Sequence, residues 1–270
     1  MEINFSKIHG LGNDFIVINE LKKEIVKGKA AFAKRYCDRH SGVGADGVLF
    51  LSKSNIADLH MRIFNSDGSE AENCVNGLRC TALQKFLLGK KKKKKFSIET
   101  LAGLVNAKIV SFKKNLALVE IEFLGRKQFK GKFYIDLEGK AFEYYSVDVG
   151  NPHAVVFLKD SVEDFPVEAL GHKFEYHKQF APARTNTEFV NVVSPTDVKM
   201  RVHERGACET QACGSGSIAI VIAGIKAGLL DSGKWVKVQQ PGGTLEIHFS
   251  GEKLFLRGNA EIVFEGKLEA

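Results

Sequence analysis

The fold is decided by the stretch MRIFNSDGSEAENCVNG at residues 61–77, which is matched 139 positions later by MRVHERGACETQACGSG at residues 200–216. The residues that the two stretches share are Met61 and Met200, Arg62 and Arg201, Glu70 and Glu209, Cys74 and Cys213, and Gly77 and Gly216. A repeat over about half of the 270 residues predicts two similar lobes and argues against a solenoid.

Each cysteine of the repeat is followed by a predicted helix. Residues 75–88 have apolar side chains at a spacing that suits one helical face, and residues 217–227 are apolar almost all round, which is typical of a buried helix. Gly89 and Gly228 follow as natural C-terminal caps. Short alternating runs predict strands at 14–19, 96–100, 116–123, 154–158, 245–249 and 254–257. Many short strands with one central helix per lobe indicate an α+β fold.

The composition is that of a soluble globular protein, with 44% hydrophobic and 26% charged residues. The longest apolar run, near residues 218–225, is too short for a membrane span. The N-terminus shows no signal sequence, so we expect a cytoplasmic protein. Much of the net charge of +7 comes from the lysine run at 90–95. We interpret this run as a solvated loop, because no base-reading motif accompanies it to support nucleic-acid binding.

The five cysteines stand at positions 37, 74, 80, 208 and 213. Their odd number, without an export signal, argues against a disulfide framework. They form no CxxC pair, and Cys37 with His40 is the nearest approach to the spacing of zinc ligands. We therefore predict no metal site and leave zinc as a weaker alternative.

Cys74 and Cys213 stand at the starts of the two predicted helices. Unpaired backbone N–H groups and the helix dipole stabilise a thiolate there, so we expect the pKa of each thiol to be lowered. The same N–H groups bind carboxylates, and Gly214, Ser215 and Gly216 would let the backbone approach a ligand closely. A single cysteine at a helix start is usually a small buried apolar residue. Two at equivalent places of a repeat indicate a functional pair.

A symmetric pair of thiols suits the inversion of a stereocentre. One group removes a proton from one face of a carbon, and the other delivers a proton to the opposite face. Two helix N-termini directed at one carboxylate would stabilise the enediolate-like charge that develops. A Cys–His hydrolase using His153 or His203 is an alternative, but it would leave the repeat unexplained. No phosphate loop with a suitable lysine is evident, so we expect no pyridoxal or other cofactor.

Four motifs closely resemble those of diaminopimelate epimerases. They are HGLGNDF at 9–15, RIFNSDGSE at 62–70, GNPH at 150–153 and ERGACETQACGSG at 204–216. The resemblance extends from about residue 5 to residue 266. It implies interconversion of LL- and meso-2,6-diaminopimelate in lysine and peptidoglycan biosynthesis.

The resemblance also implies a lobe organisation. Each pseudo-symmetric lobe would be a curved, mostly antiparallel sheet around a central helix. The N-terminal lobe would comprise residues 1–114 and be completed by a C-terminal strand at about 259–270. The C-terminal lobe would comprise residues 115–258, with the boundary in a polar turn near Lys114. The family further implies a homodimer.

Individual roles follow from the resemblance. Cys213 would take the proton from the LL substrate and Cys74 would donate one, while His153 and Glu204 would tune the thiols. Backbone N–H groups for the reacting carboxylate would come from Val75, Asn76, Gly214 and Ser215. The distal amino and carboxylate groups would be held by Asn13, Asn65, Asn151, Asn186, Glu204 and Arg205.

Three positions depart from the family pattern. Val75 and Cys208 stand where glycine is usual, and Gly47 replaces a residue that is commonly glutamine. Only the backbone of Val75 is needed, so we expect function to be retained. Proline racemases and hydroxyproline epimerases are related alternatives, but their substrates would give Arg205 less to bind. A thiol redox or metal-binding module is the alternative from another class.

Overall fold

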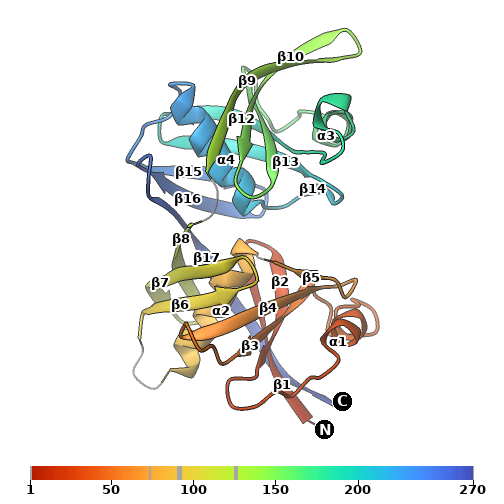
Figure 1. Cartoon of the computed structure of the whole chain (residues 1–270), viewed down its shortest axis with the longest axis vertical. Helices are drawn as coiled ribbons and strands as arrows, with labels where there is room; N and C mark the ends of the chain where they lie inside the picture. Colours follow the sequence, from red (N-terminus) through yellow and green to blue (C-terminus); the bar gives the residue numbers. More distant parts are fainter. Residues whose placement is uncertain (1, 73, 90–92, 125–126, 270) are drawn as a thin grey trace. The chain divides into compact units, whose positions relative to one another are not determined.

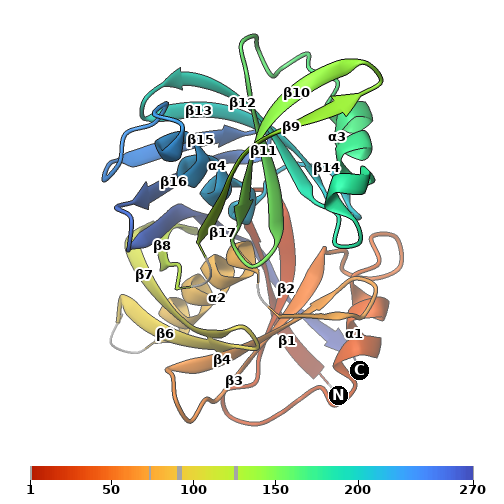
Figure 2. The same cartoon turned by 45° about the horizontal axis from the view of Figure 1, so that its top comes forward.

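The chain folds into two compact units. The computed structural model describes residues 2–72, 74–89, 93–124 and 127–269. Unit 1 is Met1–Phe123 together with Arg257–Ala270, and unit 2 is Leu124–Leu256. In each unit, strands surround one helix (Figure 1, Figure 2).

The sheet of unit 1 is a closed and mostly antiparallel barrel. Its strands are β1 (Glu2–Gly10), β2 (Asn13–Asn19), β3 (Gly47–Ser52), β4 (Leu59–Asn65), β6 (Lys95–Thr100), β7 (Gly103–Lys113), β8 (Leu116–Glu122) and part of β17 (Leu254–Glu269). They pair in the order β17–β1–β2–β3–β4–β6–β7–β8, and β8 pairs with β17, so the sheet closes. The β2–β3 and β4–β6 pairs are parallel. The short β5 (Glu70–Ala71) pairs with β4.

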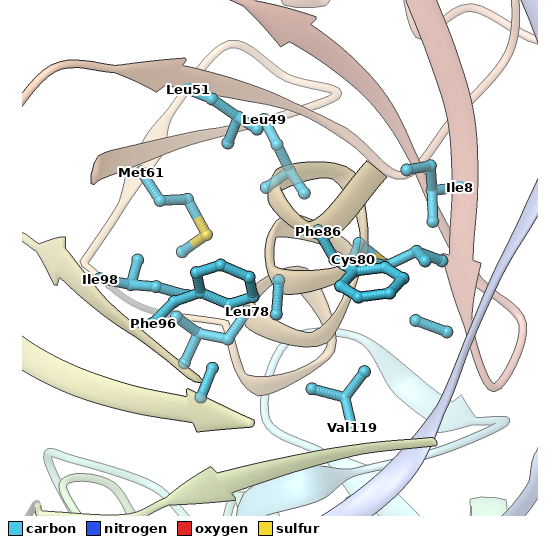
Figure 3. Packing of buried hydrophobic residues seen from close by; sticks show 14 of the residues in the cluster. Ile8, Leu49, Leu51, Met61, Leu78, Cys80, Phe86, Phe96, Ile98 and Val119 are labelled. Atoms are coloured by element: carbon cyan, nitrogen blue, oxygen red, sulfur yellow. The ribbon is translucent and has the colours of Figure 1, made fainter. Parts of the chain in front are cut away.

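The helix α2 (Val75–Leu88) lies inside this barrel and contacts β1, β2, β3, β4, β7 and β8. Its Leu78, Leu83 and Phe86 are buried in one apolar cluster with strand residues such as Leu49 and Met61 (Figure 3). Each such side chain contributes about 1.5–3 kcal/mol by leaving water. The barrel core therefore fixes the position of α2 and of its first turn.

A second helix of unit 1, α1 (Lys29–Tyr36), packs against β4. Its Phe32 makes an edge contact with Phe50 of β3, whose ring in turn contacts Phe64. These rings belong to an apolar cluster separate from that around α2. The helix α1 was not among the elements predicted from the sequence.

Unit 2 repeats the plan of unit 1. Its strands are β9 (Gln128–Leu137), β10 (Lys140–Asp148), β11 (Pro152–Leu158), β12 (Asn186–Ser194), β13 (Asp197–Glu204), β14 (Cys208–Thr210), β15 (Trp235–Gln240) and β16 (Gly243–Phe249). They pair in the order β9–β10–β11–β12–β13–β15–β16, and β14 pairs with β13. The central α4 (Gly214–Lys226) contacts β9 to β12 and β16. Outside it, α3 (Val167–Glu175) packs on β12, β13 and β14, and a short 3-10 helix (Lys178–Phe180) follows.

The repeated arginine and glutamate form the same ion pair in both units. Arg62 of β4 donates to both carboxylate oxygens of Glu70 in β5, at 2.6 and 2.8 Å. Arg201 of β13 donates in the same way to Glu209 in β14, at 2.6 and 2.8 Å. Each pair ties two short antiparallel strands together just before a cysteine. The repeat in these two positions is therefore structural.

The predicted helices are present, with differences at their ends. α2 spans the expected residues, whereas α4 begins at Gly214, three residues before the expected start. Gly228 follows α4 in the left-handed region, at φ 72°, where glycine is favoured. Gly89 caps α2 in an extended conformation instead, at φ −76°.

The units divide at 123/124 and 256/257, not at residue 114. The strand β8, which follows residue 114, belongs to unit 1 because it pairs with β7 and packs on α2. Of the predicted lysine loop, residues 90–92 lie outside the described residues. Lys93 forms an ion pair of 2.7 Å with Asp58, so this part of the run is neutralised in place.

Candidate active site

Cys74 and Cys213 occupy the N-cap positions of α2 and α4. Both have extended backbones, at φ −151° and −123°, which is usual for an N-cap. The Gly77 N–H donates to Sγ of Cys74 at 3.3 Å, and the Gly216 N–H donates to Sγ of Cys213 at 3.3 Å. Each sulfur therefore accepts a hydrogen bond from an N–H that the helix leaves unpaired. The two thiols of the repeat therefore accept the same backbone hydrogen bond.

In unit 1, Cys74 belongs to a group of hydrogen-bonded amides. Its Sγ lies 3.8 Å from Oδ1 of Asn13, the first residue of β2. The same oxygen accepts a hydrogen bond of 3.1 Å from Nδ2 of Asn76 on α2. The Nδ2 of Asn13 donates to Asp46 at 2.8 Å. Both ends of the Asn13 amide are therefore held.

In unit 2, Cys213 is almost completely buried among polar groups. Its backbone N–H donates to Oε1 of Gln240 at 2.8 Å, and its Sγ lies 3.4 Å from Oγ of Ser215. The Glu204 carboxylate, at the end of β13, lies near enough for its charge to act on this thiol. The Thr210 hydroxyl donates to the same carboxylate. Cys213 therefore has a carboxylate partner where Cys74 has an amide.

Burial and two nearby carboxylates together determine the direction of the pKa shift of the Cys213 thiol. Burial, together with the charges of Glu204 and Glu188, raises the pKa of Cys213 well above its ordinary value. Hydrogen bonds from Ser215 and Gly216 act in the opposite direction but do not outweigh burial. The expectation that the helix N-terminus lowers the pKa of this thiol is therefore wrong for Cys213. Burial also raises the pKa of the Glu204 carboxyl.

His153 links two further side chains in unit 2. Its Nδ1 lies 2.6 Å from Oε1 of Glu188, and both side chains are fully buried. Its Nε2 lies 3.0 Å from Oδ1 of Asn151, whose Nδ2 is 3.5 Å from Oγ of Ser215. The chain of contacts thus connects the β11–β12 pair to the first turn of α4. It places His153 beside the Cys213 half-site.

The other predicted residues take varied positions. Asn65 ends β4 and donates to Ser69 at 3.0 Å. The buried Asn186 accepts a hydrogen bond of 2.8 Å from the backbone N–H of Arg205, so its amide supports the protein chain itself. The guanidinium of Arg205 is exposed and donates to the Ala183 carbonyl at 2.6 Å.

Val75 and Gly214 are the first residues of α2 and α4. Their N–H groups lie where a helix leaves donors unpaired, as the prediction requires. Cys208 has φ 61°, in the left-handed region that favours the glycine expected there. A β-carbon at Gly47 would lie 2.7 Å from the Phe64 carbonyl oxygen, so the backbone at this position leaves no room for a side chain.

Sequence reasoning missed three residues of these half-sites, namely Glu188, Gln240 and Arg79. Glu188 is a charged residue inside a strand, directly before the apolar Phe189 and Val190, and this was a usable signal because buried charges need partners. Arg79 lies on the predicted apolar helix and is likewise fully buried. Nothing in the pattern around Gln240 marks it.

Within the described part of the chain, no cluster of three or more histidine, cysteine, aspartate or glutamate side chains could hold a metal ion. The described helices include none that is long and apolar enough to cross a membrane. The described cysteines are all free thiols.

Comparison with known sequences gives a consistent result. The family model for diaminopimelate epimerase matches residues 5–122 and 145–263. The diaminopimelate epimerase of Carboxydothermus hydrogenoformans is 41% identical over 280 residues, covering 98% of this chain and 99% of that protein. Diaminopimelate epimerase 1 of Nostoc sp. is 42% identical over 287 residues, covering 99% of this chain and 100% of that protein.

Solved structures share the fold at low sequence identity. A hydroxyproline epimerase from Agrobacterium vitis, with bound trans-4-OH-L-proline, has a TM-score of 0.71 and 14% identity over 99% of this chain and 92% of that chain. A PhzF-family phenazine biosynthesis protein from Enterococcus faecalis has a TM-score of 0.72 and 13% identity, with full coverage of both chains. These likenesses confirm the expected α+β fold class.

Proposed function

The chain belongs to the diaminopimelate epimerase family, and from this premise we propose that it interconverts LL- and meso-2,6-diaminopimelate without a cofactor. Membership confirms the resemblance that the motifs indicated. In this role the enzyme would serve lysine and peptidoglycan biosynthesis in the cytoplasm. Its active form would be a homodimer, as is expected for the family.

The observation that carries the proposal is the matched setting of the two thiols. Cys74 and Cys213 each cap a central helix and each accept an N–H from a glycine three residues later. An enzyme that inverts a stereocentre needs an acid on one face of the α-carbon and a base on the other. In the LL direction, Cys213 takes the α-proton and Cys74 delivers a proton to the opposite face.

The helix N-termini would stabilise the charge that develops during this reaction. Removal of the α-proton spreads negative charge onto the reacting carboxylate, and free N–H groups bind such an oxyanion. The donors in this proposal are the backbone N–H groups of Val75, Asn76, Gly214 and Ser215. Val75 can serve because only its backbone is used.

Glu204 and His153 would adjust the proton affinity of Cys213. A thiolate whose conjugate acid has a raised pKa is a stronger base, which suits the removal of a weakly acidic α-proton. Burial raises the pKa of the Glu204 carboxyl as well, so this group would hold a proton near the thiol and share it during the reaction. His153 would act through Asn151, at 3.0 Å, and Ser215.

The remaining predicted residues would hold the distal end of the substrate. Arg205 would pair with the distal carboxylate, because a guanidinium binds a carboxylate through two parallel hydrogen bonds. Asn186 would position Arg205 through its backbone N–H. The distal ammonium would be bound by Glu204 and the amides of Asn13, Asn65 and Asn151.

A second candidate is the epimerisation of proline or hydroxyproline, favoured by the shared fold of the hydroxyproline epimerase. Solvent exchange of the α-proton separates the two. We expect deuterium from D2O to enter diaminopimelate, but not L-proline or trans-4-hydroxy-L-proline, when each is incubated with the protein and followed by NMR. Exchange into a proline and none into diaminopimelate would overturn the proposal.

A further inference from the structure

Arg79, on the second turn of α2, is fully buried without an acidic partner. Its Nη2 donates to Oδ1 of Asn76 at 2.7 Å, and its Nε donates to the carbonyl of Asn259 at 3.2 Å. Its Nη1 lies 3.5 Å from the Val75 carbonyl. None of the described carboxylates pairs with it. Burying a charge costs free energy unless the charge is paired, so packing alone does not account for this arginine.

The hydrogen bonds of Arg79 fix the direction of the amides that reach Cys74. A guanidinium can only donate, so Asn76 must turn its oxygen to Arg79 and its Nδ2 to Asn13. At the other end, the Asp46 carboxylate can only accept, so Asn13 turns its Nδ2 to Asp46. The Asn13 oxygen is thereby left facing the thiol, 3.8 Å from Sγ.

We propose that Arg79 is a positioning residue for Cys74: through Asn76 and Asn13 it fixes the amide oxygen that accepts a hydrogen bond from the protonated thiol, and its buried positive charge acts in the opposite sense by favouring the thiolate. The inference rests on the proposed function, in which Cys74 is one of the two acid–base thiols. Arg79 need not touch substrate in this role.

The charge of Arg79 can act on few other groups. Burial lowers the pKa of Arg79 to about 10, and the negative forms of Cys80 and Cys74 oppose this shift. The coupling is mutual, so the guanidinium stabilises those thiolates in return. Burial raises the pKa of the fully buried Cys80 far above its ordinary value, so that thiol stays protonated. Of these two thiols, Cys74 is therefore the one on which the charge of Arg79 can act.

The charged groups near Nδ2 of Asn13 form ion pairs with one another. Arg39 donates to Asp14 at 2.7 Å and to Asp46 at 2.8 Å. The Lys7 ammonium lies 2.7 Å from the Asp14 carboxylate. This network, on β1, β2 and the segment before β3, pairs both carboxylates with cations. Among these described residues, Arg79 is therefore the cation near Cys74 that has no carboxylate partner.

The two half-sites differ at this position. The residue that follows Arg79 by 139 positions is Ile218, which is buried on α4. Cys213 thus has no matching arginine and faces the Glu204 carboxylate. The repeat keeps both thiols but gives them neighbours of opposite charge. Such a difference would let the free enzyme rest with a thiolate at Cys74 and a protonated thiol at Cys213, which is the arrangement that acts in the meso-to-LL direction.

Site-resolved alkylation tests the inference without substrate. The native protein is treated briefly with iodoacetamide over a range of pH, and modification of Cys74 and Cys213 is measured by mass spectrometry of their peptides. In Arg79→Gln we expect the rate at Cys74 near neutral pH to fall about tenfold relative to Cys213, as for a shift of about one pH unit in its profile. Arg79→Lys keeps the charge and should restore most of the rate.

The matched control is Arg35→Gln, which removes an exposed arginine of α1. It should leave the ratio of Cys74 to Cys213 modification unchanged. An unchanged ratio in folded Arg79→Gln would overturn the inference, whether or not the protein proves to be an epimerase. If Arg79→Gln does not fold, Asn76→Ala is the deciding variant, because it removes the amide that links Arg79 to Asn13 and leaves the arginine in place. A change in the ratio of at least threefold is then expected, and no change would count against the inference.

Discussion

The carboxylate of Glu188 packs directly against Gly216. Its Oε1 lies 2.7 Å from the point that a β-carbon on Gly216 would occupy, and its Cγ and Cδ lie at 3.1 and 3.2 Å. The same carboxylate is bound to His153 at 2.6 Å and is fully buried, so it cannot move aside easily. The Gly216 N–H donates to Cys213. The first turn of α4 is therefore held between a thiol and the buried Glu188 side chain, which is itself hydrogen-bonded to His153.

The first prediction is that Gly216→Ala destabilises the protein. The added methyl group must displace Glu188, and overpacking of this kind typically costs about 1–3 kcal/mol. The matched control is Gly77→Ala, where the methyl group would approach the flexible tip of Leu49 at 3.1 Å and otherwise make ordinary contacts with Cys74, at 3.5 and 3.7 Å. Alanine gains up to about 1 kcal/mol over glycine within a helix, so the control should be nearly neutral. Urea unfolding measures both, and equal losses would contradict the prediction.

The second prediction concerns Glu204→Gln. Burial and the negative charge of Glu204 raise the pKa of Cys213, so removal of this charge should make the thiolate form at lower pH. Alkylation of Cys213 should therefore begin at lower pH than in the wild type. Turnover should fall at least tenfold, because the carboxyl group can no longer share a proton with the thiol. The control is Glu163→Gln, which removes an exposed carboxylate that forms an ion pair with Lys199. It should alter neither the pH at which Cys213 is alkylated nor the turnover. If the pH dependence of Cys213 alkylation is the same in Glu204→Gln as in the wild type, Glu204 does not raise the pKa of this thiol.

The third prediction is an acid-sensitive contribution from Asp14. Burial pushes the pKa of this carboxyl upward, but Arg39 and Lys7 outweigh burial and hold the pKa at about 2. Because the folded pKa lies below the unfolded value of 3.8, the stabilisation is present above about pH 4 and is lost as the pH falls toward 2. It amounts to about 2 kcal/mol.

Asp14→Asn should remove this pH dependence. Its free energy of unfolding, measured by urea between pH 5 and pH 2, should fall less steeply than that of the wild type. Asp160→Asn, at an exposed position, is the control and should follow the wild type. Parallel curves for Asp14→Asn and the wild type would show that the ion pairs with Arg39 and Lys7 do not contribute as expected.

Much of the fold could be read from the repeat. The residues after Cys74 and Cys213 have the apolar pattern of core helices, and both helices are present. The helix α1 was missed because its eight residues, Lys29–Tyr36, are too short a run for the helical spacing of Phe32, Ala33 and Tyr36 to stand out in the sequence. The boundary near residue 114 was misplaced because strand pairing between β7 and β8 is not visible in a local pattern.

The candidate site could be predicted only in part. The motif residues were found because they match the motifs of the family that the sequence resembles, although several of them, such as Asn13 and His153, stand far from either cysteine in the sequence. Glu188 and Gln240 reach Cys213 from other strands, at separations of about 25 residues along the chain, and only the sheet brings them near. The direction of the pKa shift at Cys213 depends on these neighbours. A rule based on the helix N-terminus alone therefore gave the wrong sign.

The two-thiol account is tested most directly by turning over LL-diaminopimelate in D2O. Because the proton leaves to Cys213 and a solvent-exchanged proton arrives from Cys74, the meso product should carry deuterium at the inverted carbon. The recovered LL substrate should carry little deuterium at early times. Cys74→Ser and Cys213→Ser should each abolish inversion, because a serine hydroxyl is far less acidic than a thiol. Product that retains the original proton, or full activity in either serine variant, would contradict the account.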